Sequence, residues 1–253
     1  MGALHQGHLS LVRRSRKEND LTVLSIFVNP AQFSPTEDLA KYPRNFKQDL
    51  LLAKREKTDI IFYPSIKEIY PKGCLTYIHV EEIADGLCGK FRPGHFRGVA
   101  TIVGKLLNIV QPDTMYLGQK DAQQVVVLKK MAADINFPVT IKVCPTIREK
   151  DGLALSSRNS YLTQEQRKEA PVLFESLNQA KEKIRAGERK TQELIGLIEK
   201  NIQQKSSGRI EYIACADAKT LKHLEKLKGE VLIALAVWFG STRLIDNITV
   251  RIP

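Results

Sequence analysis

Paired cysteines and long hydrophobic segments are both absent from this chain, and each absence excludes a class of protein. The four cysteines are far apart and lack the Cys-x-x-Cys pairs or neighbouring histidines of a structural zinc site. We therefore expect reduced, mostly buried thiols. The longest apolar run, Val231 to Phe239, is about half as long as a membrane span requires, and no signal peptide precedes the first motif. The sequence predicts a cytoplasmic protein without a membrane partner.

Acidic residues are fewer than basic ones, at 28 Asp and Glu against 39 Lys and Arg, which gives a formal net charge of +11. Such an excess suits nucleic acid, and it equally suits small anionic substrates. The basic residues are scattered along predicted helices, and no basic sheet with interleaved aromatic residues of the RNA-binding type occurs. The distribution favours small anions, and we expect no nucleic-acid partner.

Strand-like and helix-like apolar patterns alternate through the first part of the chain. Strands are expected at residues 21–28, 60–63, 77–80, 113–117 and 139–143, and helices at 45–57, 99–110 and 122–135. The run at 21–28 is apolar throughout, as in a parallel strand that is buried on both faces. We predict an α/β fold in which residues 1–160 form a Rossmann-like, doubly wound parallel sheet.

The composition changes after Tyr161 to helices rich in Lys, Glu and Gln, at residues 164–186 and 191–204. Strands are expected at 210–215, 231–238 and 242–250, with a helix at 218–227 and Trp238 in the core. We predict a smaller C-terminal α+β domain that spans residues 161–253.

The segment that opens the chain is the first candidate for a functional site. His5 and His8 lie three residues apart with Gly7 between them, which places both rings on one face of a starting helix. Backbone N–H groups at a helix start attract phosphate, and imidazole can donate to a phosphoryl oxygen. The pattern suits a nucleoside triphosphate. The alternative is a helix cap with two solvated histidines.

Polar side chains also follow the ends of the predicted strands, where ligands of open α/β sheets gather. They comprise Asn29 and Gln32, then Arg92 and His95 in the glycine-rich loop 89–98, then Lys120, Asp121 and Gln124, and finally Ser156, Ser157 and Arg158. Each set has a structural alternative, because turn residues, solvated loop charges and helix caps use the same side chains. No single set identifies a function.

Five motifs in this order resemble the pantothenate synthetase family. They are His5–His8, Val28–Phe33, Arg92–Arg97, Gly118–Asp121 and Leu155–Arg158, and the similarity runs from Met1 to Ile252. The resemblance implies a homodimeric, magnesium-dependent ligase of the nucleotidylyltransferase superfamily. Such an enzyme joins pantoate to β-alanine through a pantoyl adenylate, and it converts ATP to AMP and pyrophosphate.

The resemblance also implies residue roles. The expected ATP-binding residues are Met1, Gly2, Ala3, Leu4, His5, Gln6, Gly7, His8, Gly118, Gln119, Lys120, Asp121, Ile147, Leu155, Ser156, Ser157 and Arg158. The expected catalytic residues among them are His8, His5, Lys120, Ser156, Ser157 and Arg158. Pantoate or β-alanine would be bound by Gln32, Gln124, Asn29, Arg92 and His95. Asp49 is a candidate magnesium ligand, with a solvated helix carboxylate as the alternative.

Two other functions are compatible with parts of the pattern. A nucleotidylyltransferase could transfer AMP to a phosphate ester, but the neutral pair Gln32 and Gln124 suits a hydroxy acid better. A basic RNA-binding protein that has kept a nucleotide-binding fold is the second alternative.

One feature departs from the family, which has a strand ending in Pro-Thr immediately before the Met-Gly of this motif. The present sequence starts at Met1, so we expect the first strand of the sheet to lie outside it. We expect that roughly 20–30 residues precede Met1 in the natural protein, as judged from the size of such a strand-and-helix unit. The sequence as given is then expected to fold less stably and to bind ATP poorly.

Overall fold

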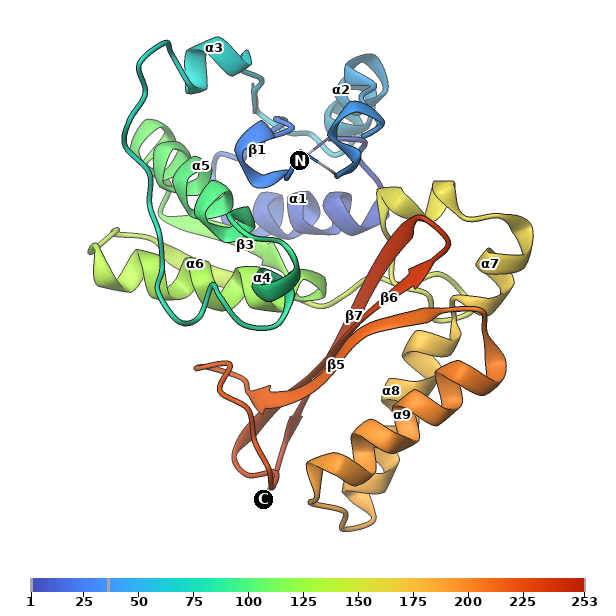
Figure 1. The fold of residues 1–253 in the computed structure, drawn as a ribbon. Coiled ribbons are helices and arrows are strands. Elements are labelled where there is room, and N and C mark those ends of the chain that lie inside the picture. The colour runs from blue at the N-terminus through green and yellow to red at the C-terminus, as the bar shows by residue number, and fades with distance from the viewer. Residues whose placement is uncertain (1, 36, 253) are drawn as a thin grey trace. The chain divides into compact units, whose positions relative to one another are not determined.

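A computed structural model describes residues 2–35 and 37–252 of the chain. The chain divides into two compact units, one of Met1–Gln119 with Gln123–Pro145 and the other of Lys120–Ala122 with Thr146–Pro253 (Figure 1). Within the described residues, no helix combines the length and the apolar character that a membrane crossing needs.

Parallel strands form the framework of the first unit. Strand β1 (Val23–Ser25) pairs with β2 (Ile60–Phe62), and β3 (Thr114–Gly118) pairs with β4 (Thr140–Cys144). Between the strands along the chain lie helices α2 (Phe46–Arg55), α3 (Ile66–Ile69), α4 (Cys88–Phe91), α5 (His95–Val110) and α6 (Ala122–Asp134). Parallel pairing with intervening helices confirms the predicted α/β class. The pairs are separate two-stranded sheets rather than one continuous sheet, since no described strand joins them.

Helix α1 (Gln6–Glu18) is held in the first unit by its apolar stripe. Leu9 and Val12 are buried against Leu24 and Ile26, which lie on and just after β1, and against Ala53 of α2. This spacing along α1 is the period that buries one helix face. The start of α1 is thereby fixed beside the end of β1.

Two predictions for the first unit are wrong. No strand forms at residues 77–80, where the N–H of Ile78 instead donates to the Thr101 side chain of α5 at 2.9 Å. The segment 89–98 is only partly a loop, because α4 occupies its start and α5 begins at His95. At Ile78 the neighbouring helix supplies a contact that local sequence alone did not indicate.

The second unit is an antiparallel sheet covered by helices. Strands β5 (Arg209–Asp217), β6 (Glu230–Phe239) and β7 (Thr242–Arg251) pair in that order. Helices α8 (Val172–Arg185) and α9 (Thr191–Lys205) lie side by side and share one core with the sheet (Figure 1). Fully buried Leu177, Ile198 and Ile233 join the three layers of that core.

Local chemistry explains the differences from prediction in this unit. The helix expected at 164–186 is divided into α7 (Gln164–Glu169) and α8 by Pro171, which has no N–H to donate. No helix forms at 218–227, because the Asp217 carboxylate accepts from the N–H groups of Lys219 and Thr220 and stabilises a turn.

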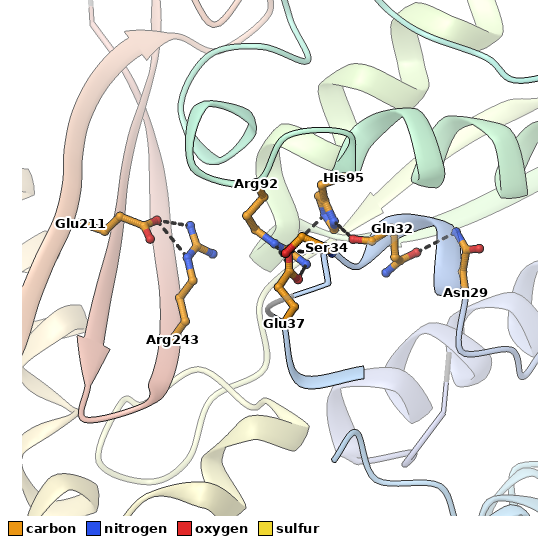
Figure 2. A network of polar contacts seen from close by, with 8 residues as sticks. All are labelled: Asn29, Gln32, Ser34, Glu37, Arg92, His95, Glu211 and Arg243. Carbon is orange, nitrogen blue, oxygen red and sulfur yellow. Dashed lines mark hydrogen bonds and ion pairs between the residues drawn. The ribbon is translucent and has the colours of Figure 1, made fainter. Parts of the chain in front are cut away.

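Trp238 is only partly buried, contrary to its predicted place in the core. Its indole N–H donates to Glu211 at 2.8 Å. Arg243 donates to the other carboxylate oxygen of Glu211 from Nε at 2.9 Å (Figure 2). Glu211 lies where the register between β5 and β6 shifts, and such a bulge redirects a side chain.

All four cysteines are free thiols, as expected, and Cys88, Cys144 and Cys215 are buried. Burial raises the pKa of the Cys215 thiol to about 12. A thiol that stays protonated is a poor nucleophile, so Cys215 has a structural role.

The boundary between the compact units lies at Pro145–Thr146, whereas the composition changes after Tyr161. The intervening residues fold with the C-terminal sheet, because Arg148 pairs with Asp246 of β7 and the 3₁₀ turn Ser157–Tyr161 contacts β7. The change in composition after Tyr161 marks the start of the solvent-exposed helices. The boundary between the units instead depends on which residues contact one another.

Candidate active site

The segment before α1 makes a strained turn that a buried carboxylate holds in place. Ala3 has a φ of 51°, in the left-handed region that non-glycine residues rarely adopt. Asp49 of α2, only 2% exposed, accepts from the N–H of Ala3 at 3.0 Å and from that of Leu4 at 2.7 Å. The turn therefore depends on a residue 45 positions away. Met1, the first predicted ATP contact, lies outside the described residues.

His5 and His8 cap the start of α1 reciprocally. The Nδ1 atom of His5 accepts from the N–H of Gly7 at 3.1 Å, and the Nδ1 atom of His8 accepts from the N–H of His5 at 3.4 Å. A neutral imidazole that accepts at Nδ1 carries its proton on Nε2. The two partly buried rings lie 4.0 Å apart, so the turn holds two neighbouring Nε2–H donors. The histidines are a helix cap, as one interpretation held, but they are not fully solvated.

Asp49 is not the solvated carboxylate considered as one alternative from the sequence. Its two oxygens already accept the backbone N–H groups of Ala3 and Leu4. Across residues 2–35 and 37–252, no three His, Cys, Asp or Glu side chains gather in a way that could hold a metal ion. The donors present do not fit a magnesium ion held by protein side chains. A magnesium ion would depend mainly on phosphate oxygens of ATP.

We expect Asp49→Ala to lower the free energy of unfolding by about 2–4 kcal/mol, because two backbone N–H groups lose a buried charged acceptor. ATP affinity should fall as well, since the turn at Ala3 loses the contact that holds it. Urea unfolding and ATP titration measure the two effects. Asp59→Ala is the matched control, because Asp59 also accepts a backbone N–H, from Thr22 at 2.7 Å. An Asp49 variant that binds ATP as the control does would refute the anchoring role.

A second group of polar side chains surrounds Gln32 (Figure 2). Asn29 is 3% exposed and donates to the Gln32 side chain at 3.2 Å and to the carbonyl of Gly98 at 3.0 Å. Tyr70 donates its hydroxyl proton to Asn29 at 2.8 Å, and burial raises the pKa of Tyr70 to about 12. The hydroxyl therefore stays a donor. The buried Asn29 side chain therefore orients the Gln32 side chain. The sequence alone had allowed that Asn29 is only a turn residue.

Arg92 and His95 hold the backbone on the other side of Gln32. Arg92 donates to Glu37 from Nε at 3.1 Å and also from Nη2, and its Nη1 lies 3.1 Å from His95 Nε2. His95 Nδ1 lies 2.8 Å from the carbonyl oxygen of Gln32 and must donate to it. Arg92 and Glu37 are 13% and 19% exposed, so these are not the solvated loop charges of the alternative interpretation.

The Glu37–Arg92 pair gives an expected pH dependence of stability. Burial raises the pKa of Glu37, but the hydrogen bond and the charge of Arg92 outweigh burial and leave the pKa below the ordinary value of 4.5. A carboxyl group with a lowered folded-state pKa stabilises the protein above its unfolded pKa, and this contribution is lost as the pH falls through the folded pKa.

We therefore expect Glu37→Gln to lower the thermal midpoint at pH 7, with a difference from wild type that shrinks below pH 4.5. Thermal unfolding followed by circular dichroism between pH 3 and pH 7, about the range in which carboxyl groups titrate, measures it. Glu182→Gln, which removes an exposed partner of Arg185, should have little effect at any pH. A constant difference at all pH values would contradict the assignment.

The second unit holds Lys120 and Asp121 in one segment and the predicted residues from Ile147 to Arg158 in another. Lys120 and Asp121 lie in the 3₁₀ turn Gln119–Asp121 before α6, and Lys120 Nζ is 3.5 Å from an Asp121 carboxylate oxygen. Residues 147 and 155 pair, since the N–H of Leu155 donates to the carbonyl of Ile147 at 3.0 Å. The Ser156 side chain accepts from the N–H of Arg158 at 3.2 Å and caps the turn that follows.

Gln124 lies on α6 beside a glutamine that sequence analysis did not single out. Gln123 is 7% exposed, accepts from the N–H of Cys88 at 2.9 Å and donates to the carbonyls of Ile83 and Gly86. It fixes the segment 83–88 against α6. The only sequence signal for this role is a polar residue at a buried helix position, near Val125.

The structure thus places the predicted residues in four groups, with Gln124 apart from them on α6. The helix cap of His5 and His8, with Asp49, and the network around Gln32 belong to the first unit. Lys120 with Asp121, and the segment from Ile147 to Arg158, belong to the second. Asp49, Glu37 and Gln123 are supporting residues whose contacts only the structure reveals.

Comparisons with known proteins identify the family of this chain. A family model described as pantoate-beta-alanine ligase matches residues 1–249. The pantothenate synthetase of Acetivibrio thermocellus is 55% identical over 252 residues, which cover 100% of this chain and 90% of that protein. The enzyme of Moorella thermoacetica is 54% identical, with 100% and 89% covered.

Solved structures give the same result. The crystal structure of pantothenate synthetase from Thermus thermophilus has a TM-score of 0.95 at 42% identity, covering 98% of this chain and 90% of that one. Pantoate-beta-alanine ligase from Francisella tularensis, complexed with beta-gamma ATP and beta-alanine, has a TM-score of 0.75 at 39% identity, with 98% and 86% covered. The sequence motifs, the fold and these matches together show that the chain belongs to the pantoate–β-alanine ligase family.

Proposed function

We propose that this ligase condenses pantoate with β-alanine through a pantoyl adenylate, on a Rossmann-like, doubly wound fold. In this proposal residues 1–160 bind ATP and pantoate. The observation that carries it is the reciprocal cap of His5 and His8, which provides two ring N–H donors at a helix start. Family membership supports the substrates and disfavours both nucleotidyl transfer to a phosphate ester and RNA binding.

The reaction has two displacements. A carboxylate oxygen of pantoate attacks the α-phosphorus of ATP, and the bond from that phosphorus to the bridging oxygen breaks, so pyrophosphate leaves. The amine of β-alanine then attacks the acyl carbon, the carbon–nitrogen bond forms with loss of a proton, and AMP leaves with the electron pair. Adenylation replaces a poor leaving group by a good one.

Negative charge moves onto pyrophosphate in the first step, and the chain offers donors and cations to stabilise it. The Nε2–H groups of His5 and His8 would donate to phosphoryl oxygens. The charges of Lys120 and Arg158, with the hydroxyls of Ser156 and Ser157, would bind the triphosphate. Backbone from Gly2 to Gly7 and from Gly118 to Asp121, with Ile147 and Leu155, would line the nucleotide.

Pantoate recognition is assigned to neutral amides. Gln32, which Asn29 holds at 3.2 Å, and Gln124 can bind both hydroxyl and carboxylate groups. Arg92 and His95 would then act by placing the Gln32 backbone, since their polar atoms already contact Glu37 and Gln32. Magnesium would be brought to the site as the ATP complex. We expect a cytoplasmic homodimer, and light scattering of the purified protein tests the dimer.

ATP and pantoate without β-alanine should yield pyrophosphate and an enzyme-held pantoyl adenylate. The reason is chemical: the activated acyl group is already a mixed anhydride and needs no covalent carrier on the protein. Quench-flow with ATP labelled in the α-phosphate measures it, with pantoate and β-alanine each omitted in turn. If label reaches AMP only when β-alanine is present, and no adenylate can be trapped, the two-step mechanism is wrong.

A further inference from the structure

Strand β7 carries two adjacent buried polar residues that the proposed chemistry does not use. Asp246 and Asn247 are 3% and 4% exposed. Burying a carboxylate and an amide is unfavourable unless their atoms are hydrogen-bonded. The partners of these two side chains therefore indicate their role.

The two side chains point to opposite faces of the sheet, because successive residues of a strand alternate. Asp246 shares its face with Leu244 and Ile248, which belong to the core beneath α8 and α9. Asn247 lies on the other face, where Ala122 packs against Leu232 and Ala234. Ala234 is also the register partner of Asn247.

Asn247 binds the backbone of a predicted catalytic residue. Its Nδ2 donates to the carbonyl oxygen of Lys120 at 2.9 Å, across 127 positions of sequence. The segment Lys120–Ala122 accordingly belongs to the second compact unit, although the rest of α6 belongs to the first. The position of the Lys120 peptide limits where its ammonium group can reach.

Asp246 binds Arg148, which lies in the hairpin that leads to the other predicted phosphate-binding segment, Ser156–Arg158. Its carboxylate accepts from Arg148 at 2.6 Å and 2.9 Å and from the N–H of Asn247 at 2.8 Å. Arg148 also donates to the carbonyl of Gly152 at 3.0 Å and lies 3.6 Å from the ring centre of Phe174. These contacts hold the paired residues 147 and 155, and Ser156 follows directly.

We propose that Asn247 is a positioning residue for adenylation. Through the Lys120 carbonyl it sets the place of the Lys120 ammonium relative to the segment Ser156–Arg158, which Asp246 holds through Arg148. A strand near the end of the chain thus controls the spacing of two groups that bind the triphosphate. The inference rests on the proposed role of Lys120 in binding ATP.

A double-mutant cycle tests the proposal. Asn247→Ala should lower kcat/KM for ATP, measured as pantoate-dependent pyrophosphate release, by about ten- to a hundredfold, as small displacements of catalytic groups do. KM for pantoate should stay unchanged. In the Lys120→Ala background, the same Asn247 substitution should lower kcat/KM for ATP by no more than about twofold, because residues acting as one unit are non-additive.

Asn201→Ala is the matched control in the same unit. Asn201 of α9 is 7% exposed and donates its amide to Ser176 at 2.8 Å. Both alanine variants should lower the thermal midpoint, but only Asn247→Ala should change kcat/KM for ATP. The cycle is also run with Asn247→Ser, a less drastic change, so that it can be read from whichever variant folds.

The outcomes separate this inference from the proposed function. Equal losses of kcat/KM in the wild-type and Lys120→Ala backgrounds would show that Asn247 does not act through Lys120. A variant that loses thermal stability alone, as the Asn201 control does, would also overturn the proposal. Wild-type protein that releases no pyrophosphate with pantoate and ATP would contradict the proposed function instead.

Discussion

His8→Ala is expected to lower the rate of adenylate formation by about a hundredfold or more, because a donor placed at the phosphoryl oxygens acts mainly in the transition state. Single-turnover quench-flow with ATP and pantoate measures the rate. The variant should remain folded, since the loss of one cap contact costs only about 1 kcal/mol.

The capping geometry suggests a second variant at His8 that disturbs the helix start less. His8 is the third residue of α1, where glutamine reaches back to the N-cap backbone in many helices. His8→Gln should therefore keep the contact to the His5 N–H and replace the imidazole donor by the amide N–H of a neutral side chain of different shape. We expect near-normal stability with the same loss of rate. The exposed His223→Ala is a control for surface histidine loss. Near-normal turnover of either His8 variant would contradict the assignment.

Lys120→Ala is expected to lower kcat/KM for ATP by about a thousandfold, with a larger part in ATP affinity than for His8→Ala. A point charge attracts the triphosphate in the ground state as well as in the transition state. Initial rates over a range of ATP concentrations, with direct ATP titration, separate the two contributions.

Lys130→Ala is the matched control for charge. Lys130 lies on α6, the helix that follows the turn of Lys120, with its side chain 52% exposed and paired to Asp134 at 2.5 Å. Loss of this surface pair should leave both ATP affinity and rate near the wild-type values. An unchanged KM for ATP in Lys120→Ala would contradict the role of Lys120.

Local patterns in the sequence predicted most of the helices and strands. The apolar stripe of α1, the capping residues before it and the buried runs of β6 and β7 depend on neighbours a few positions away. The spacing of His5 and His8 could also be interpreted locally, because both residues belong to the cap and first turn of one helix. The motifs that indicated the family are likewise short and continuous.

The predictions that failed have a tertiary cause in one unit and a local cause in the other. Residues 77–80 have a strand-like pattern, but the N–H of Ile78 pairs with the Thr101 side chain. Residues 218–227 have a helical pattern, but the Asp217 carboxylate captures the first N–H groups. In each case a partner outside the pattern offered a better contact than regular structure did.

Local sequence patterns could not predict the residues that support the candidate site. Asp49 contacts Leu4 across 45 positions, Arg92 contacts Glu37 across 55, and Asn247 contacts Lys120 across 127. A buried polar group must find a partner, but its identity depends on which segments the fold brings together. The sequence by itself predicted the candidate reacting side chains and most of the local structure near them, whereas the residues that hold those side chains in place follow from long-range contacts.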